Sequence, residues 1–259
     1  MQLGLQDKIV IVTGGAKGIG RAIVDTLIEE GAVPVIADKD EETLNEVVAH
    51  YEGKGEAIDG FAGDLVDPKT CERVIEKTME RFGRIDGLVN NAGVNDRVGL
   101  DAGPKAFMGS IEKNLLHVYC MAHYSLPHLI KSQGPIVNIS SKTALTGQGD
   151  TSAYIAAKGG VLGLTREWAV ELAKHSIRVN AVVPAEVWTP LYEWWVNRFD
   201  DPEAAKRDVE AYIPLGNRMT TPREIASMVV YLLSMQASHI TGQYLHVDGG
   251  YVHLDRMMT

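Results

Sequence analysis

The sequence predicts an α/β fold, a single domain in which helices cover both faces of a doubly wound parallel sheet. Two observations support this prediction. Short β-branched runs alternate along the chain with segments of helical hydrophobic period, which is typical of repeated strand–helix–strand units. The strand segments are apolar at successive positions, so water must be excluded from both of their faces.

The first unit occupies residues 9–37. Residues 9–12 form a β-branched run, residues 19–30 have the period of a helix that Gly31 ends, and residues 33–37 form the next strand. Further strands are expected at 57–62, 87–90, 135–139, 178–183 and 244–247, with helical patterns between them. No repeat or low-complexity linker divides the chain, which indicates one domain over residues 1–259.

One segment departs from this rhythm. Residues 189–221 are rich in Trp, Tyr, Pro and acidic side chains and lack a strand period. We expect an inserted helical flap here, of the kind that covers a site.

Composition excludes several classes of protein. The net charge of −9 argues against a nucleic-acid partner, and no apolar run approaches the roughly 18–20 residues that cross a bilayer. Without a visible secretory signal, a cytoplasmic location is expected. The two cysteines, Cys71 and Cys120, fit a reduced protein with buried thiols. The eight histidines show no metal-binding spacing, and no metal is predicted.

A glycine-rich turn follows the first strand, with the sequence Thr-Gly-Gly-Ala-Lys-Gly-Ile-Gly at residues 13–20. Glycine permits a sharp turn and a close approach by another group. The helix that begins here offers unpaired N–H groups to a pyrophosphate, although such a turn can also be purely structural.

Asp38 ends the second strand, near the position at which an acid binds a ribose 2′-hydroxyl. A carboxylate repels a 2′-phosphate, so NAD is favoured over NADP. Lys17 and Lys39 lie near enough in sequence to offset part of that repulsion, and NADP remains the alternative. Asp38 could also be a solvated residue at a strand end.

Asp64-Leu65 and Asn90-Asn91-Ala92-Gly93 follow the third and fourth strands, at the sheet edge where ligands of such folds bind. Asp64 is expected to contact adenine, and the segment at Asn90 to contact ribose. Either segment could instead serve as a turn or a cap.

The candidate catalytic residues come later in the chain. Tyr154 and Lys158 are four positions apart, which places phenol and ammonium on one helical face. A fixed cation lowers the pKa of a phenol, so Tyr154 is expected to act as a base. Ser141, at a strand end, is placed to bind the substrate oxygen, and Asn114 to anchor a proton-carrying water. An isolated Tyr-x-x-x-Lys pair is more often a surface pair; the full ordered set is what indicates catalysis.

In this ordered set the chain resembles the short-chain dehydrogenase/reductase family, from Leu5 to Gly250. The resemblance implies a Rossmann-type sheet of about seven strands, hydride transfer at a nicotinamide, Tyr154 as acid/base, and Lys158 binding ribose. It also implies that Thr189 binds the carboxamide. The implied cofactor-binding set is Gly14, Lys17, Gly18, Ile19, Gly20, Asp38, Asp64, Leu65, Asn91, Ala92, Gly93, Tyr154, Lys158, Pro184, Val187 and Thr189. Pro184-Ala185 replaces the family's usual Pro-Gly, which leaves the fine placement of the nicotinamide open.

Polar residues surround the expected substrate pocket: Asn95, Ser141, Lys142, Gln148, Tyr154, Glu186 and Trp188. A steroid would leave such groups unpaired at about 1–3 kcal/mol each, whereas a polyol satisfies them. Trp188, Trp194 and Trp195 are candidates to stack on a pyranose ring, although Trp194 could equally face solvent.

Several segments, among them residues 91–96, 140–143, 146–149, 184–192 and 248–256, resemble a subgroup of the family, the L-fucose dehydrogenases. That similarity implies oxidation of the anomeric hydroxyl of L-fucose, or of D-arabinose or L-galactose, to a lactone. It further implies a homotetramer, with helices near residues 117–131 and 159–174 as interfaces and a tail carrying Tyr251 and His253 that reaches a neighbouring pocket.

Two alternatives stay open. The enzyme could oxidise a hydroxysteroid or another secondary alcohol, or the chain could be a nucleotide-binding regulator without turnover. An intact Ser141, Tyr154 and Lys158 argues against the regulator, and the length leaves no room for the larger substrate domain of a sugar-nucleotide epimerase.

Overall fold

A seven-stranded parallel sheet forms the centre of the molecule in the computed structural model, which describes residues 2–254. Its spatial order is β3-β2-β1-β4-β5-β6-β7, and every neighbouring pair is parallel. The strands are β1 (Ile9–Thr13), β2 (Val33–Asp38), β3 (Asp59–Ala62), β4 (Gly87–Asn90), β5 (Ile136–Ile139), β6 (Val179–Pro184) and β7 (Tyr244–Val247). The predicted fold class is therefore confirmed.

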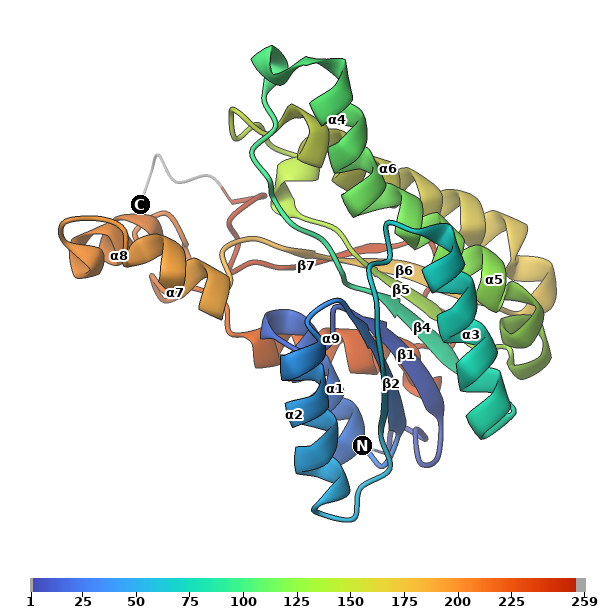
Figure 1. The fold of residues 1–259 in the computed structure, drawn as a ribbon. Coiled ribbons are helices and arrows are strands. Elements are labelled where there is room, and N and C mark those ends of the chain that lie inside the picture. Colours follow the sequence, from blue (N-terminus) through green and yellow to red (C-terminus); the bar gives the residue numbers. More distant parts are fainter. Residues whose placement is uncertain (1, 255–259) are drawn as a thin grey trace.

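Helices cover both faces of the sheet (Figure 1). On one face lie α1 (Gly18–Glu29), α2 (Glu41–Glu52) and α9 (Pro222–Leu233), and on the other α3 (Pro68–Phe82), α5 (His117–Ser132) and α6 (Ser152–Glu171). The remaining α-helices are α4 (Gly103–Ile111), α7 (Pro190–Val196) and α8 (Pro202–Glu210). Short turns of 3-10 helix are η1 (Leu100–Ala102), η3 (Lys142–Ala144), η4 (Ala173–His175) and η5 (Met235–Ala237), and η2 (Glu112–Leu116) is a π-helix.

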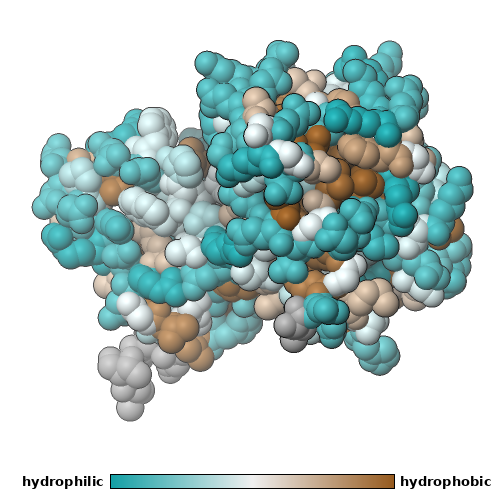
Figure 2. All heavy atoms as spheres, turned by 90° about the horizontal axis from the view of Figure 1, so that it is seen from below, coloured by the Kyte–Doolittle hydropathy of each residue, from teal (hydrophilic) through white to brown (hydrophobic). Residues whose placement is uncertain are grey.

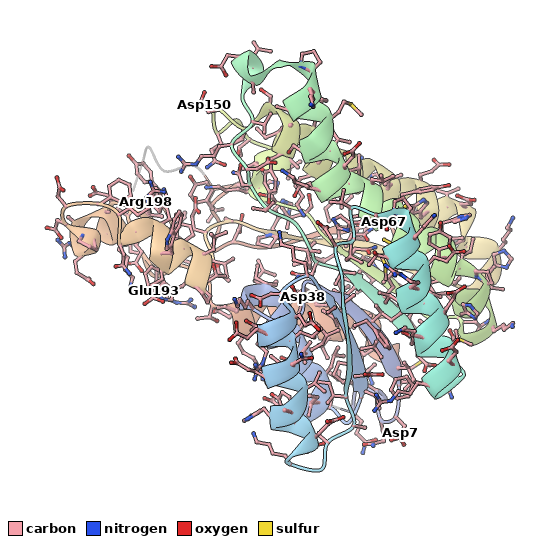
Figure 3. The ribbon with its side chains drawn as sticks, viewed as in Figure 1. Asp7, Asp38, Asp67, Asp150, Glu193 and Arg198 are labelled. Atoms are coloured by element: carbon pink, nitrogen blue, oxygen red, sulfur yellow. The ribbon has the colours of Figure 1, made fainter. Side chains whose placement is uncertain are left out.

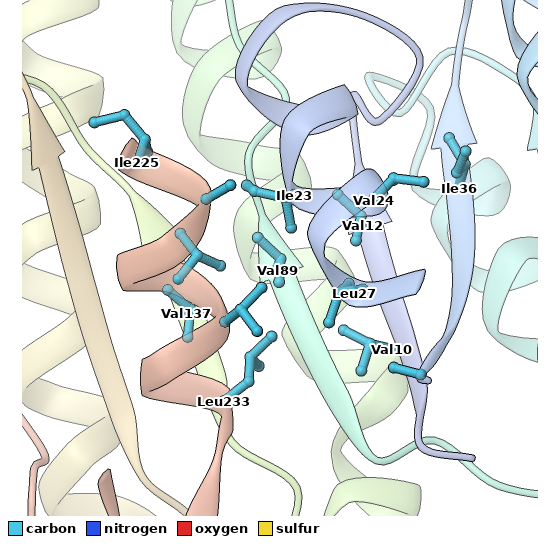
Figure 4. Packing of buried hydrophobic residues seen from close by; sticks show 14 of the residues in the cluster. Val10, Val12, Ile23, Val24, Leu27, Ile36, Val89, Val137, Ile225 and Leu233 are labelled. Atoms are coloured by element: carbon cyan, nitrogen blue, oxygen red, sulfur yellow. The ribbon is translucent and has the colours of Figure 1, made fainter. Parts of the chain in front are cut away.

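The sequence of β1 explains why two helical layers are needed. Successive side chains of a strand point to opposite faces, and all five residues of β1 are buried. Val10 and Val12 pack against α1 and α9, as Figure 4 shows, whereas Ile9 and Ile11 join the cluster beneath α3 and α5. A polar residue on either face would therefore be buried in a helix–sheet interface.

The order of strands reverses beside β1, because β2 lies on one side of it and β4 on the other. At such a reversal the connections leave in opposite directions and open a crevice at the carboxyl ends of the strands. The strands β1, β2, β4 and β5 all have their carboxyl ends at this edge, and the loops that follow them begin there. The topology thus brings the sequence-predicted site residues together.

Element boundaries differ slightly from those predicted. β3 begins at Asp59 rather than at residue 57, and it carries Gly60, whose absent Cβ leaves room for Leu44 of α2. The flap predicted over 189–221 contains α7 and α8, which project from the body of the molecule (Figure 1).

Both thiols lie inside the protein, unpaired as disulfides and largely inaccessible to water. Burial raises the pKa of Cys71 to about 12, and burial raises that of Cys120 as well. The face in Figure 2 is mostly hydrophilic, with its apolar residues in scattered patches. Among residues 2–254, no helix combines the length and the apolar character needed to span a membrane.

Candidate active site

The glycine-rich turn between β1 and α1 is shaped by close backbone contacts. Gly14 and Gly18 have φ values of +64° and +57°, a conformation that strains other residues. A Cβ on Gly20 would lie 2.0 Å from the carbonyl oxygen of Gly14. No side chain caps the start of α1, so its first N–H groups are free to bind an anion. This arrangement fits the pyrophosphate of a dinucleotide.

Asn91 holds this turn in place from the end of β4. Its amide nitrogen donates to the carbonyl oxygens of Thr13 and Gly14 at 2.9 and 3.0 Å, while the Thr13 hydroxyl accepts from the backbone N–H groups of Asn91 and Ala92. The side chain of Asn91 therefore supports the loop, a role that the sequence motif alone did not distinguish from ribose contact.

Asp38 lies at the carboxyl end of β2 and is half-buried (Figure 3). Its carboxylate accepts hydrogen bonds from the backbone N–H groups of Ala16 and Asp40, at 3.0 and 3.1 Å, which fixes it toward the glycine turn. It lines a cavity of about 420 Å³ together with Asp64 and Leu65. Those three residues form the part of the cleft that suits an adenosine.

Ser141, Tyr154 and Lys158 meet on the other side of Gly93. Ser141 follows β5, and its hydroxyl accepts a hydrogen bond from the Thr143 hydroxyl at 3.0 Å. Lys158 is almost fully buried, and its ammonium donates to the carbonyl oxygen of Ile139 at 2.8 Å. It lies 5.8 Å from the centre of the Tyr154 ring. The candidate catalytic groups therefore line one cavity of about 470 Å³.

The pKa of Tyr154 is shifted in the direction opposite to the one predicted. Burial raises it to about 12, and the hydrogen bond with Ser141 opposes this shift. Burial lowers the pKa of Lys158 to about 8. The sequence argument considered the charge of Lys158 but not the desolvation of the phenol, which is larger. A phenol in this state keeps its proton at neutral pH, so removal of a proton from an alcohol becomes faster as the pH rises.

Asn114 lies behind this cavity rather than on its wall. Its side-chain oxygen accepts from the backbone N–H of Val94 at 2.8 Å, and its amide nitrogen donates to the Ser110 carbonyl at 3.0 Å. It belongs to the π-helix η2, a distortion that often marks functional positions. The backbone of Gly93 separates it from the cleft, because a Cβ there would lie 3.1 Å from the Asn114 oxygen and 3.2 Å from the Lys158 nitrogen.

An ion pair forms the far wall of the same cavity. Lys142 of η3 pairs with Glu186 of the loop after β6, and the side chains are only 10% and 16% exposed. The ring of Tyr251 lies 3.9 Å from the Lys142 ammonium, and the carboxylate of Glu186 raises the pKa of Tyr192 on α7, after the effect of burial. Four separate segments thus meet around one buried pair of charges.

Most of the predicted site residues line the catalytic cavity of about 470 Å³. They are Gly14, Lys17, Gly18, Ile19, Gly20, Asn91, Ala92, Gly93, Asn95, Ser141, Lys142, Gln148, Tyr154, Lys158, Pro184, Glu186, Val187 and Thr189. Thr189 also caps α7, and its methyl group approaches Gly18 from across the cleft.

Trp188, a predicted substrate-binding residue, lies outside the catalytic cavity. Its indole ring packs 4.4 Å from the ammonium of Lys206 on α8, and it does not line the cavity. Trp194 is 56% exposed, and Trp195 packs against Phe199. The prediction that Trp188 binds substrate is therefore not supported by its position, because its indole lies against Lys206 of α8. Tyr192 lines the cavity instead, and its aromatic character in the flap was the available signal.

Metal ligands do not gather anywhere in residues 2–254: no group of three or more His, Cys, Asp or Glu side chains is placed to hold an ion. The site geometry is that of organic acid/base groups beside a nucleotide cradle.

Known proteins share this arrangement. The family described as enoyl-(acyl carrier protein) reductase matches residues 14–252. An L-fucose dehydrogenase of Mus musculus is 37% identical over 91% of this chain and 85% of its own, and the 3-oxoacyl-[acyl-carrier-protein] reductase FabG of Thermotoga maritima is 36% identical over 93% and 96%.

A crystal structure of the dehydrogenase Cj0485 superposes with a TM-score of 0.95 at 44% identity, covering 100% of this chain and 99% of that one. The fold, the order of the site residues and these matches agree. The chain belongs to the short-chain dehydrogenase/reductase family, and it is an NAD(P)-dependent oxidoreductase that acts on CH–OH groups.

Proposed function

We propose that this enzyme oxidises the anomeric hydroxyl of a free sugar, L-fucose in the first place and D-arabinose or L-galactose as further candidates, to the lactone. The observation that carries this proposal is the Lys142–Glu186 pair beside Ser141 and Tyr154. An apolar substrate would cover these two charges without replacing their hydrogen bonds, at a cost of about 1–3 kcal/mol for each unsatisfied group. Sugar hydroxyls both donate and accept, so they satisfy an ammonium and a carboxylate together.

The residues of the cleft divide the reaction among them. Ser141 binds the reacting oxygen and holds it beside the Tyr154 oxygen, which in its phenolate form takes up the proton as the C1–H bond breaks. The NAD nicotinamide, when bound, accepts the hydride. Lys158 holds a positive charge near the phenol as it loses and regains its proton. Hydrolysis of the lactone makes oxidation the favoured direction.

NAD is the proposed coenzyme, with NADP as the alternative. Asp38 is fixed at the rim of the adenosine cavity, where a carboxylate accepts from a 2′-hydroxyl and repels a 2′-phosphate. Lys17, one of the two nearby cations, is already paired with Asp40 at 2.5 Å. We expect Asp38→Ser to lower kcat/KM for NAD about tenfold and to raise that for NADP, as measured with both coenzymes on one substrate.

The proposal is tested by screening free aldoses with each coenzyme while nicotinamide absorbance is recorded. L-fucose, D-arabinose and L-galactose are expected to react fastest. An acetoacetyl thioester, assayed in the reductive direction, and a 3-hydroxysteroid complete the panel, because the similarity to FabG favours an acyl reductase as the second candidate. Turnover of the thioester or steroid without turnover of any sugar would overturn the sugar assignment and leave the family assignment intact.

A homotetramer is proposed from the same resemblance. Tyr119 on α5 and Val170 on α6 are 51% and 78% exposed, as expected of helix faces that meet another subunit. Light scattering of the purified protein measures the assembly directly. The Tyr251 ring contacts Lys142 of its own chain, so this contact needs no neighbouring subunit.

A further inference from the structure

Glu186 is the only acid among the described residues that line the catalytic cavity. The other charged residues of that lining are Lys17, Lys142 and Lys158, all of them cations. Lys17 pairs with Asp40 beside the glycine turn, and Lys158 is buried and donates to a backbone carbonyl oxygen. The charge balance at the substrate end of the cavity therefore depends on the pairing of Glu186 with Lys142.

The ammonium of Lys142 is enclosed by partners from its own chain. It pairs with the Glu186 carboxylate, and both side chains are largely buried. The centre of the Tyr251 ring lies 3.9 Å from the same nitrogen, which is a cation–π contact. A cation enclosed in this way attracts a further anion weakly, because the Glu186 carboxylate repels any negative charge that approaches the pair.

The pair is near enough to the reacting groups to contact the same substrate. Lys142 directly follows Ser141 in the chain, so their Cα atoms are about 3.8 Å apart. Both residues line the cavity that also contains Glu186 and Tyr154. Charges act strongly across a partly enclosed cavity, because the effective dielectric constant there is lower than that of bulk water. One charge added to this wall or removed from it therefore changes which substrates bind.

We propose that Glu186 sets the charge selectivity of the pocket, so that the enzyme accepts uncharged sugars and excludes sugars that carry a carboxylate, such as uronic acids. This inference rests on the proposed function and narrows its substrate class to neutral aldoses. Lys142 has the charge and the donors that bind a carboxylate, but Glu186 occupies that position. Without the Glu186 charge, Lys142 becomes a binding group for a substrate carboxylate. The reaction at C1 is the same for both kinds of sugar: the hydride passes to NAD and the proton to Tyr154, while the carboxylate is unchanged.

The test compares the wild type with Glu186→Gln, which keeps the shape of the side chain and removes its charge. The substrates are L-galactose and L-galacturonate, which differ only in the alcohol or carboxylate at C6. Acetate is assayed as a competitive inhibitor against the fastest alcohol substrate, because it can reach a freed ammonium whatever the orientation of the sugar. Glu193→Gln is the matched control for net charge, since Glu193 lies exposed on α7 (Figure 3) and does not line the cavity.

Glu186→Gln is expected to lower the inhibition constant of acetate about tenfold and to raise the ratio of kcat/KM for L-galacturonate to that for L-galactose about ten- to a hundredfold. High salt should weaken both effects by screening the attraction. Glu193→Gln should leave both quantities within about twofold of the wild type. The acetate constant decides: a value in Glu186→Gln that stays at that of the wild type, or an equal decrease in Glu193→Gln, would overturn the inference.

Two further outcomes are distinguishable. A wild type that oxidises other alcohols but no sugar would overturn the proposed function, and acetate inhibition with the alcohol that reacts would still test the role of Glu186. If Glu186→Gln does not fold, Lys142→Gln provides the reciprocal test, because it leaves the Glu186 carboxylate without its cation. Ethylammonium should then inhibit competitively about tenfold more strongly than in the wild type, and an unchanged inhibition constant would reject the proposal.

Discussion

The two ends of the cleft are built from different kinds of contact. Around Gly14 the wall consists of main chain, where the Asn91 amide donates to backbone carbonyls and the Thr13 hydroxyl accepts from backbone N–H groups. Around Lys142 the wall consists of side chains that come from four distant segments. Main-chain geometry tolerates few changes of sequence, whereas a side-chain network is altered by a single substitution. The first end is therefore suited to a coenzyme shared by a whole family, and the second to a substrate particular to this chain.

The largest effect is expected where the two ends meet. Tyr154→Phe removes the phenolic oxygen that, once deprotonated, takes the substrate proton, and we expect kcat to fall about 10²–10⁴-fold. Coenzyme binding should be unchanged, because the phenylalanine ring keeps the packing. Rates are followed by nicotinamide absorbance and binding by calorimetry. Retention of more than about a tenth of the activity would show that another group removes the proton.

Gly20→Ala addresses the coenzyme end alone. The added methyl group meets the Gly14 carbonyl, so the turn must shift, and we expect weaker NAD binding together with a loss of about 1–3 kcal/mol in the free energy of unfolding. Gly109→Ala on α4 is the control, because nothing lies within 4 Å of its Cβ position. That control should stabilise the protein by about 0.5–1 kcal/mol. Equal behaviour of the two variants in thermal unfolding and NAD titration would contradict this account.

Glu186→Gln addresses the substrate end alone. It leaves Lys142 without a counter-charge in a site that is 10% exposed, and it removes a carboxylate from the pocket wall. We expect kcat/KM for the best sugar to fall about ten- to a hundredfold with KM carrying most of the change, while NAD affinity stays constant. Parallel losses of sugar and NAD affinity would mean that the two ends are not independent.

Thr221→Ala changes neither end and should have the smallest effect. Thr221 and Glu224 form a capping box at the start of α9, and its loss is expected to cost about 1 kcal/mol of stability without changing kcat. Arg218 and Thr221 lower the pKa of Glu224 to about 2, below its ordinary 4.5. The stabilisation from this carboxylate is complete above pH 4.5 and is lost as the pH falls toward 2 in both proteins, because Arg218 is the main cause of the shift and is present in both. Urea unfolding at several pH values should therefore show a similar loss of stability in the variant and in the wild type.

The difference between the two ends also explains what could be predicted from the sequence. The sheet, the glycine turn and the positions of Asp38, Ser141, Tyr154 and Lys158 follow from local patterns, because hydrophobic period and turn residues act over a few positions. The meeting of Lys142 with Tyr251, and the turning of Trp188 toward Lys206, depend on how distant loops pack. Desolvation of Tyr154 likewise depends on the packed structure, which is why the direction of its pKa shift was predicted incorrectly.

The two buried thiols, Cys71 and Cys120, can be used to measure local unfolding. A buried thiol whose pKa is raised to about 12, as for Cys71, carries almost no thiolate at neutral pH, and thiolate is the form that alkylating reagents attack. Modification of Cys71 and Cys120 must therefore wait until α3 and α5 separate from the sheet. The labelling rate with and without NAD therefore measures how far coenzyme binding reduces the opening of this helical layer.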